Sequence, residues 1–231
     1  MHAQLAIDTN TFHKILDAQL ERNKSILKKY IPEQAVDIIA HWVIELDFKL
    51  KIKKGRASKY GDYRPPVKGL NHQITINRDM NKYAFLITLV HEIAHLTNWN
   101  KHKHKVKPHG TEWKHEFKVL MRPLINEAFF PADIIHSLNG YMQNPAASSC
   151  SDENLMRTLK KYDDKSNTLL LEQISVNSIF KTSTNRYFIK GEKRRTRFLC
   201  KELHTRRQYL FSGLAEVYMT EESLQLAEKI S

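Results

Sequence analysis

Cysteine is scarce in this chain. Only Cys150 and Cys200 occur among its 231 residues, so a framework of disulfide bonds is not expected. Long apolar runs are also missing, because none approaches the roughly 20 residues that a membrane-spanning helix needs. The first residues lack the basic and apolar segments of a secretory signal. We therefore expect a soluble, cytoplasmic protein with no membrane partner.

Acidic residues are too few to balance the basic ones. The chain has 37 Lys and Arg against 25 Asp and Glu, which gives a net charge of +12 at pH 7. Such an excess attracts polyanions, because binding to a phosphate backbone releases condensed counterions. Nucleic acid is the first partner to consider, and a solvated basic surface without a specific partner is the open alternative.

The periodicity of apolar residues predicts an α+β fold. Helical and alternating patterns predict, in chain order, helices at 11–30 and from Pro32 to about Trp42, strands at 48–54 and 72–79, and helices at 81–99 and 111–121. We expect Thr111 to cap the last of these helices.

The composition changes in the second half of the chain. Residues 143–167 are polar and turn-like with a pattern for one short helix, and four short β-type runs follow before a final helix at 221–230. We therefore expect a domain at 1–142, a linker with a short helix at 143–167, and a small basic β-rich region with a C-terminal helix at 168–231.

The stretch LVHEIAHLTNW at 89–99 contains the pattern His-Glu-x-x-His. Residues four apart share one face of a helix, so the imidazoles of His91 and His95 can bind one Zn²⁺. Glu92 can reach a water beside the metal and act as general base in peptide hydrolysis. His91, Glu92 and His95 lie on a polar strip of this otherwise apolar helix. A polar strip needs a cleft to face, which favours a functional site over a structural helix.

A catalytic zinc site needs a third protein ligand. The downstream candidates are His102, His104, His109 and His115. We prefer His109, because it precedes Gly110 in a turn that can carry the chain back over the motif helix. His102 and His104 lie in a lysine-rich loop, and His115 lies inside the next predicted helix.

The residues of this region resemble a known family. HEIAHLTNW followed by HKVKPHGTEWKHEF is similar to the SprT-like zinc metallopeptidases, which include the Spartan-type DNA–protein crosslink proteases. The resemblance covers about residues 10–130 and implies a zincin-like helical core with a small β-sheet. It also implies Zn²⁺ held by His91, His95 and His109, with Glu92 as catalytic base.

The chain departs from this family in one respect. Many members carry a C-terminal zinc ribbon with two cysteine pairs, whereas this chain resembles a bacterial-type member that lacks the ribbon. Cys150 with Asp152, or Cys200 with His204, does not have ribbon spacing, so we expect buried and inert thiols.

The segment 190–211 is rich in basic and aromatic residues. Basic residues between aromatics suit phosphate neutralisation and base stacking, and the open alternative places the aromatics in the core and the charges in solvent. The candidates for nucleic-acid contact are Lys193, Arg194, Arg195, Arg197, Arg206 and Arg207. The basic loop 101–107 is a second cluster, close to the expected metal site.

Three functions remain from sequence alone. The first is a monomeric zinc endopeptidase that cleaves protein or peptide substrates and acts on DNA-associated proteins. The second is a basic nucleic-acid-binding module with a structural or vestigial metal site, and the third is an interaction protein with neither property. Glu92 favours the first, because a structural site needs no general base. For that function we expect substrate to add to the strand at 72–79.

Overall fold

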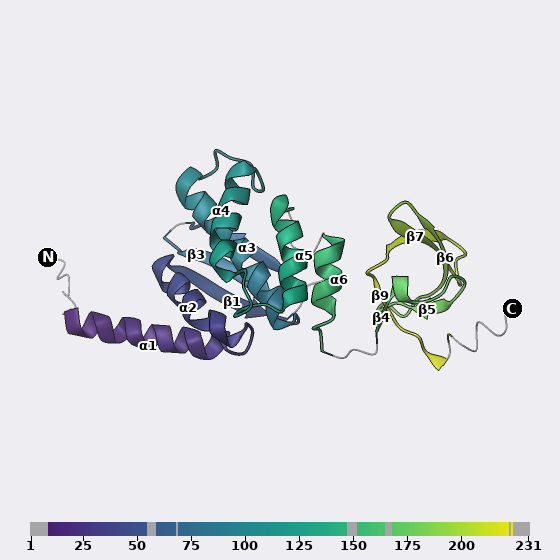
Figure 1. Cartoon of the computed structure of the whole chain (residues 1–231), viewed down its shortest axis with the longest axis horizontal. Helices are drawn as coiled ribbons and strands as arrows, with labels where there is room; N and C mark the ends of the chain where they lie inside the picture. Colours follow the sequence, from purple (N-terminus) through teal and green to yellow (C-terminus); the bar gives the residue numbers. More distant parts are fainter. Residues whose placement is uncertain are drawn as a thin grey trace. The chain divides into compact units, whose positions relative to one another are not determined.

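The computed structural model describes residues 9–54, 59–67, 69–146, 152–164, 168–221 and 223. Cys150 and most of the predicted C-terminal helix lie outside these residues. The structure is mixed α+β and divides into two compact units, Met1–Asp163 and Asp164–Ser231 (Figure 1). Within the described residues, none of the helices is long and apolar enough to cross a membrane.

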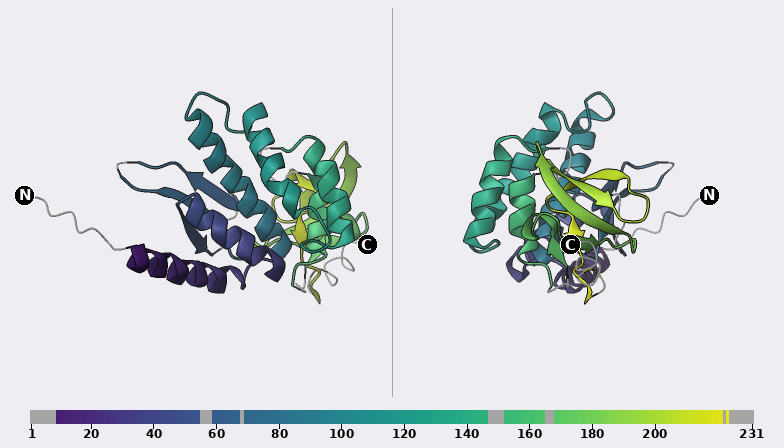
Figure 2. Two further views of the ribbon diagram at one scale, coloured as in Figure 1. Left: turned by 60° about the vertical axis from the view of Figure 1, so that its left-hand side comes forward. Right: turned by 90° about the vertical axis from the view of Figure 1, so that its right-hand side faces the viewer.

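The first unit begins with two packed helices. α1 (Thr9–Leu27) runs beside α2 (Val36–Glu45), and the 3₁₀ turn η1 (Glu33–Ala35) precedes α2 (Figure 2). Pro32 stands before η1, where its missing N–H costs no helical hydrogen bond. The buried residues of α2 recur at helical spacing and join the core of the unit.

A three-stranded sheet follows, made of β1 (Phe48–Lys53), β2 (Gly61–Arg64) and β3 (His72–Asn77). Its order is β1-β3-β2, with β1 parallel and β2 antiparallel to β3. β2 lies outside the predicted strands, because four residues of the sequence GDYR carry no apolar alternation. The expectation that substrate adds to 72–79 is wrong, because both edges of β3 are occupied by neighbouring strands.

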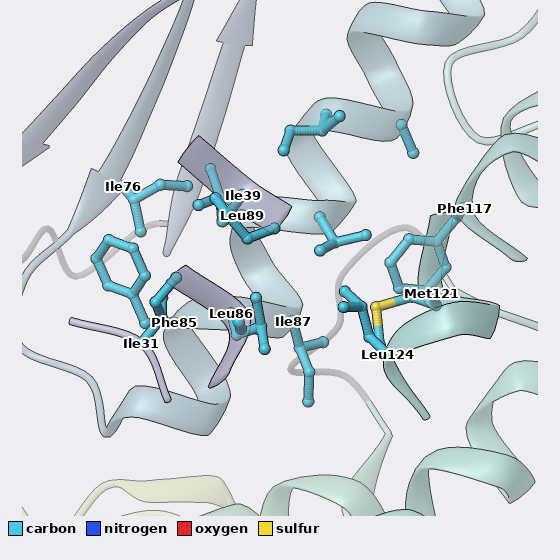
Figure 3. Close-up of a cluster of buried hydrophobic side chains, with 14 of the residues drawn as sticks. Ile31, Ile39, Ile76, Phe85, Leu86, Ile87, Leu89, Phe117, Met121 and Leu124 are labelled. Carbon is cyan, nitrogen blue, oxygen red and sulfur yellow. The ribbon is translucent and has the colours of Figure 1, made fainter. Parts of the chain in front are cut away.

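Helix α3 (Lys82–His102) crosses the centre of the unit. The side chain of Asn81 caps it by accepting hydrogen bonds from the backbone N–H groups of Tyr83 and Ala84. Its apolar side chains lie between Ile76 of the sheet and the cluster of Met121 and Leu124 (Figure 3). Burial on both sides fixes the rotation of α3 and hence the direction of its polar strip.

Helix α4 (Thr111–Met121) packs on α3. Gly110 occupies the N-cap position and Thr111 is the first helical residue, so the predicted Thr111 cap is displaced by one position. The chain continues through η2 (Arg122–Leu124), α5 (Ala132–Gln143) and α6 (Glu153–Lys160). α6 lies in the range expected to be a linker, and its Leu155 and Leu159 are buried in the core of the first unit.

The second unit is a small antiparallel β structure. Four of its strands, β5 (Ile179–Lys181), β6 (Tyr187–Arg194), β7 (Arg197–Glu202) and β8 (Gln208–Ser212), form a sheet in this order and curve around a common centre in Figure 1. β4 (Leu169–Leu170), followed by the turn η3 (Leu171–Gln173), pairs with β9 (Glu216–Val217).

Glycine makes the curvature of this sheet possible. The β6–β7 register shifts between Lys190 and Lys193, and a Cβ at Gly191 would collide with the carbonyl oxygen of Leu199. The bulge bends the two strands around a core that includes Phe180, Phe188 and Cys200.

Candidate metal centre

Three histidines from two elements converge in the first unit. His91 and His95 lie one turn apart on α3, and His109 lies in the loop that joins α3 to α4. One ring nitrogen of each lies within 4.8 Å of those of the other two. Among the described residues, this is the one group of three or more His, Cys, Asp or Glu that has such geometry.

The spacing of the nitrogens fits a metal ion with tetrahedral ligands. His109 Nε2 lies 2.9 Å from Nε2 of His95 and 3.3 Å from Nε2 of His91. Tetrahedral nitrogen ligands at 2.0–2.1 Å from zinc lie about 3.3–3.4 Å from one another. The distance from His109 to His91 matches this value, and the distance from His109 to His95 is shorter. The three neutral imidazoles therefore fit Zn²⁺, and also suit other transition metals that bind nitrogen.

Aromatic packing orients the ligand rings. The Trp113 ring centroid lies 4.5 Å from that of His91, 5.3 Å from His95 and 4.8 Å from His109. Nδ1 of His91 is buried and has no hydrogen-bond partner among the described residues. Metal-bound histidines usually donate this N–H to a carbonyl or carboxylate. In this site, van der Waals contact with Trp113 holds the ring instead.

Burial keeps the histidines neutral. Loss of hydration lowers the pKa of His91 to about 3, with smaller effects from His95 and His109. The pKa of His95 falls to about 3 for the same main reason, with a smaller effect from His109, and burial lowers the pKa of His109. A neutral imidazole has a free lone pair, which is the form that binds a metal ion.

Glu92 is buried beside the histidines and close to the edge strand β2. The residue is 7% exposed. A Cβ built at Gly61 would lie 2.8 Å from Cγ and 2.9 Å from the carboxyl carbon of Glu92. These contacts are shorter than ordinary van der Waals separation, so Glu92 occupies its position only because residue 61 has no side chain.

An open cleft of about 650 Å³ contains these groups. Residues of β2, α3 and the 103–109 loop line it, and both His91 and Glu92 are among them. On the β2 side, the ring of Tyr63 stacks on His95 with centroids 6.3 Å apart. The Tyr63 hydroxyl lies 2.8 Å from Nδ1 of His72, and this contact holds the Tyr63 ring over His95.

Sequence reasoning missed Gly61 and Tyr63. Both belong to β2, which is too short to produce a periodic pattern. A glycine between aromatic residues in the run YGDY was the available signal, because glycine inside a strand often marks the close approach of another group.

An ion pair anchors the loop that carries His109. Nζ of Lys101, near the end of α3, lies 2.7 Å from Oε1 of Glu116 on α4. Glu116 is buried, whereas Lys101 is exposed. The pair links the two helices on either side of the loop.

The other candidate ligands lie elsewhere. His102 is half-buried at the end of α3, and His115 is exposed on α4. His104 lines the outer part of the cleft and contacts the ring of Trp99. None of the three belongs to the group of converging ring nitrogens among the described residues.

The six candidate residues for nucleic-acid contact fall into two groups in the second unit. All six are exposed. Lys193, Arg194, Arg195 and Arg197 surround the β6–β7 turn, whereas Arg206 and Arg207 lie in the β7–β8 turn. The two turns are at opposite ends of β7, whose six residues span roughly 17 Å.

The aromatic residues of this segment face the interior. Phe198 is 9% exposed, and Tyr209 and Phe211 pack against the same buried cluster. In β7 the alternation places Phe198 in the core and Arg197 in solvent, which is the alternative that sequence left open, whereas Lys190 of the same segment is buried. Burial removes Phe198 from base stacking, whereas Tyr209 and Phe211 are only half-buried.

Comparison with known proteins adds no family to this description. No protein-family model matches the chain. Neither the curated proteins nor the solved structures give a match.

Proposed function

We propose that this chain is a zinc-dependent endopeptidase of the SprT-like type with a zincin-like first unit. The observation that carries the proposal is the convergence of three histidine nitrogens beside the buried Glu92 in an open cleft. His91, His95 and His109 would hold the metal, and three protein ligands are the number that leaves a coordination position open for chemistry. When bound, zinc polarises the scissile carbonyl and makes water more acidic.

Glu92 is the residue that moves the proton. Its carboxylate takes a proton from the attacking water, the water oxygen bonds to the carbonyl carbon, and the C–N bond then breaks. The same proton passes from Glu92 to the leaving amine, so the carboxylate is restored. Gly61 supports this role, because it leaves space for the carboxylate between α3 and β2.

The edge of β2 is the surface where an extended substrate would bind. The backbone N–H of Asn77 donates to the carbonyl of Tyr60, so the backbone groups of Tyr60 face β3. In an antiparallel pair every second residue has its backbone groups directed toward the partner strand. The backbone groups of Gly61 and Tyr63 therefore point to the open edge of the sheet. Hydrogen bonds to these groups would hold a peptide across the metal site with little dependence on its sequence.

We also propose that the substrate is a DNA-associated protein. The exposed cations of the second unit support it, because they suit salt-sensitive contact with a phosphate backbone. A nucleic-acid-binding module with a structural metal site uses the same cations but has no use for Glu92.

Metal analysis paired with a cleavage assay tests the proposal. We expect one zinc per chain, strong loss of zinc in His109→Ala, and full zinc occupancy without cleavage in Glu92→Gln. His115→Ala is the matched control, because this exposed histidine lies outside the group. Zinc retention by His109→Ala would move the third ligand elsewhere, and turnover by Glu92→Gln would exclude the assigned base. The assays are run with and without single-stranded DNA.

A further inference from the structure

The second edge of the three-stranded sheet carries an unusual ladder of lysines. β1 is an edge strand, and its side chains alternate between apolar and basic residues. Leu50 and Ile52 pack toward the core, whereas Lys49, Lys51 and Lys53 share the opposite face. Successive lysines on one face of a strand are roughly 6.6 Å apart.

The backbone of β1 is open to a further strand. The N–H of Arg78 donates to the carbonyl of Lys53, so the backbone groups of Lys53 face β3. The same direction holds at Lys49 and Lys51, because these groups alternate along a strand. The N–H and C=O groups of Leu50 and Ile52 therefore point away from the sheet.

A cleft of about 440 Å³ lies on the apolar side of this edge, between β1 and helices α1 and α2. Leu50 and Ile52 form part of its wall, and none of its described lining residues is Asp or Glu. Asn23 also lines the cleft, and its Nδ2 atom is buried and has no hydrogen-bond partner among the described residues. The lining combines apolar residues of β1 and the two helices with the polar residues Gln19, Arg22, Asn23 and Lys49.

The positive charge of the β1 lysines limits which strands can pair with this edge. The three lysines form none of the ion pairs found among the described residues. Two copies of β1 would bring lysine against lysine, and such repulsion is how proteins protect edge strands from self-association. A strand with carboxylates at alternate positions replaces that repulsion with attraction.

We propose that β1 is a docking site for an extended acidic peptide segment of a partner protein, in which acidic and apolar residues alternate. Its backbone pairs with Leu50 and Ile52, its apolar side chains enter the cleft beside α1, and its carboxylates lie along the lysines. The site goes beyond the proposed peptidase function, because β1 and β2 are opposite edges of the sheet, about 10 Å apart.

A labelled peptide tests this site directly. The probe is a fluorescein-labelled heptapeptide in which Glu alternates with Val, and binding is followed by fluorescence anisotropy at several salt concentrations. We expect binding that weakens with salt, and no binding of the same peptide with Lys in place of Glu. The variant Lys49→Glu/Lys51→Glu/Lys53→Glu should bind about tenfold more weakly or worse. Lys14→Glu/Lys29→Glu/Lys82→Glu has the same change in net charge and should bind as the parent chain does.

Amide hydrogen exchange of the unmodified chain locates the peptide even if the triple variant fails to fold. We expect the amides of Leu50 and Ile52 to exchange more slowly when the peptide is bound. Protection of Gly61 and Tyr63 alone would place the peptide in the metal cleft and overturn the proposal. Absence of binding at millimolar peptide, or equal binding by the lysine triple variant and its control, would overturn it as well.

Discussion

Adding a single methyl group at residue 61 should disable the proposed base without removing the metal. In Gly61→Ala, the three atoms nearest to the new Cβ all belong to Glu92, and two of these contacts would be 2.8 and 2.9 Å. Carbon atoms in ordinary contact lie 3.5–4.0 Å apart, so the carboxyl group must move by about 0.6–1.2 Å. A displacement of about 1 Å in a catalytic group costs up to about 100-fold in rate, and we expect a loss of about 10–100-fold.

The assay separates catalysis from metal binding and folding. Turnover of a quenched fluorescent peptide, zinc per chain and the thermal unfolding midpoint are measured on the same preparation. Arg64→Ala, an exposed position on the same strand, is the control and should behave as the parent chain does. Parental turnover by Gly61→Ala, with zinc and folding intact, would refute the idea that contact with β2 sets the position of Glu92.

Three further predictions concern stability and partners. Trp113 is fully buried against all three histidines, so Trp113→Ala should destabilise the first unit by about 3–5 kcal/mol in chemical denaturation and weaken zinc affinity in a chelator competition. A hydrogen bond from the Arg186 guanidinium, with a smaller one from Thr205, lowers the pKa of Glu202 from its usual 4.5 to about 2. The stabilisation from Glu202 is therefore complete above pH 4.5 and is lost as the pH falls toward 2. The thermal unfolding midpoint of Glu202→Gln should therefore depend less on pH in that range than the midpoint of the parent chain does. For DNA, Arg194→Glu/Arg195→Glu/Arg197→Glu should weaken binding and flatten the slope of log affinity against log salt by about one unit for each lost phosphate contact; unchanged affinity at low salt would make these cations a solvated surface.

Local sequence was sufficient to predict the helix of the metal site. The run from Asn81 to Trp99 has no Gly or Pro, Asn81 is a strong cap, and α3 forms at Lys82–His102. The i, i+4 relation of His91 and His95 follows directly from helical periodicity. The strands at 48–54 and 72–79 were predicted for the same kind of reason, because period-two alternation is a local property.

The periodicity of apolar residues could not predict which strands pair with one another. Which strand lies at the centre of the sheet depends on contacts between residues far apart in the chain, and alternation at 72–79 gives no information about its neighbours. The predicted substrate strand failed for this reason, and β2 was missed because a strand of four polar or aromatic residues is stabilised by its partner rather than by its own sequence.

The sequence by itself determined that one helix presents two histidines and a glutamate on the same side. It also determined that the chain is basic and has too few cysteines for a zinc ribbon. Sequence also favoured His109 as the third histidine, and tertiary structure brings it to the other two through the packing of Trp113 and α4 against α3. Tertiary structure also decided that Gly61 makes room for Glu92 and that the six cations of the second unit separate into two groups. Each of these results depends on distances across the fold, which packing sets and local residue patterns do not encode.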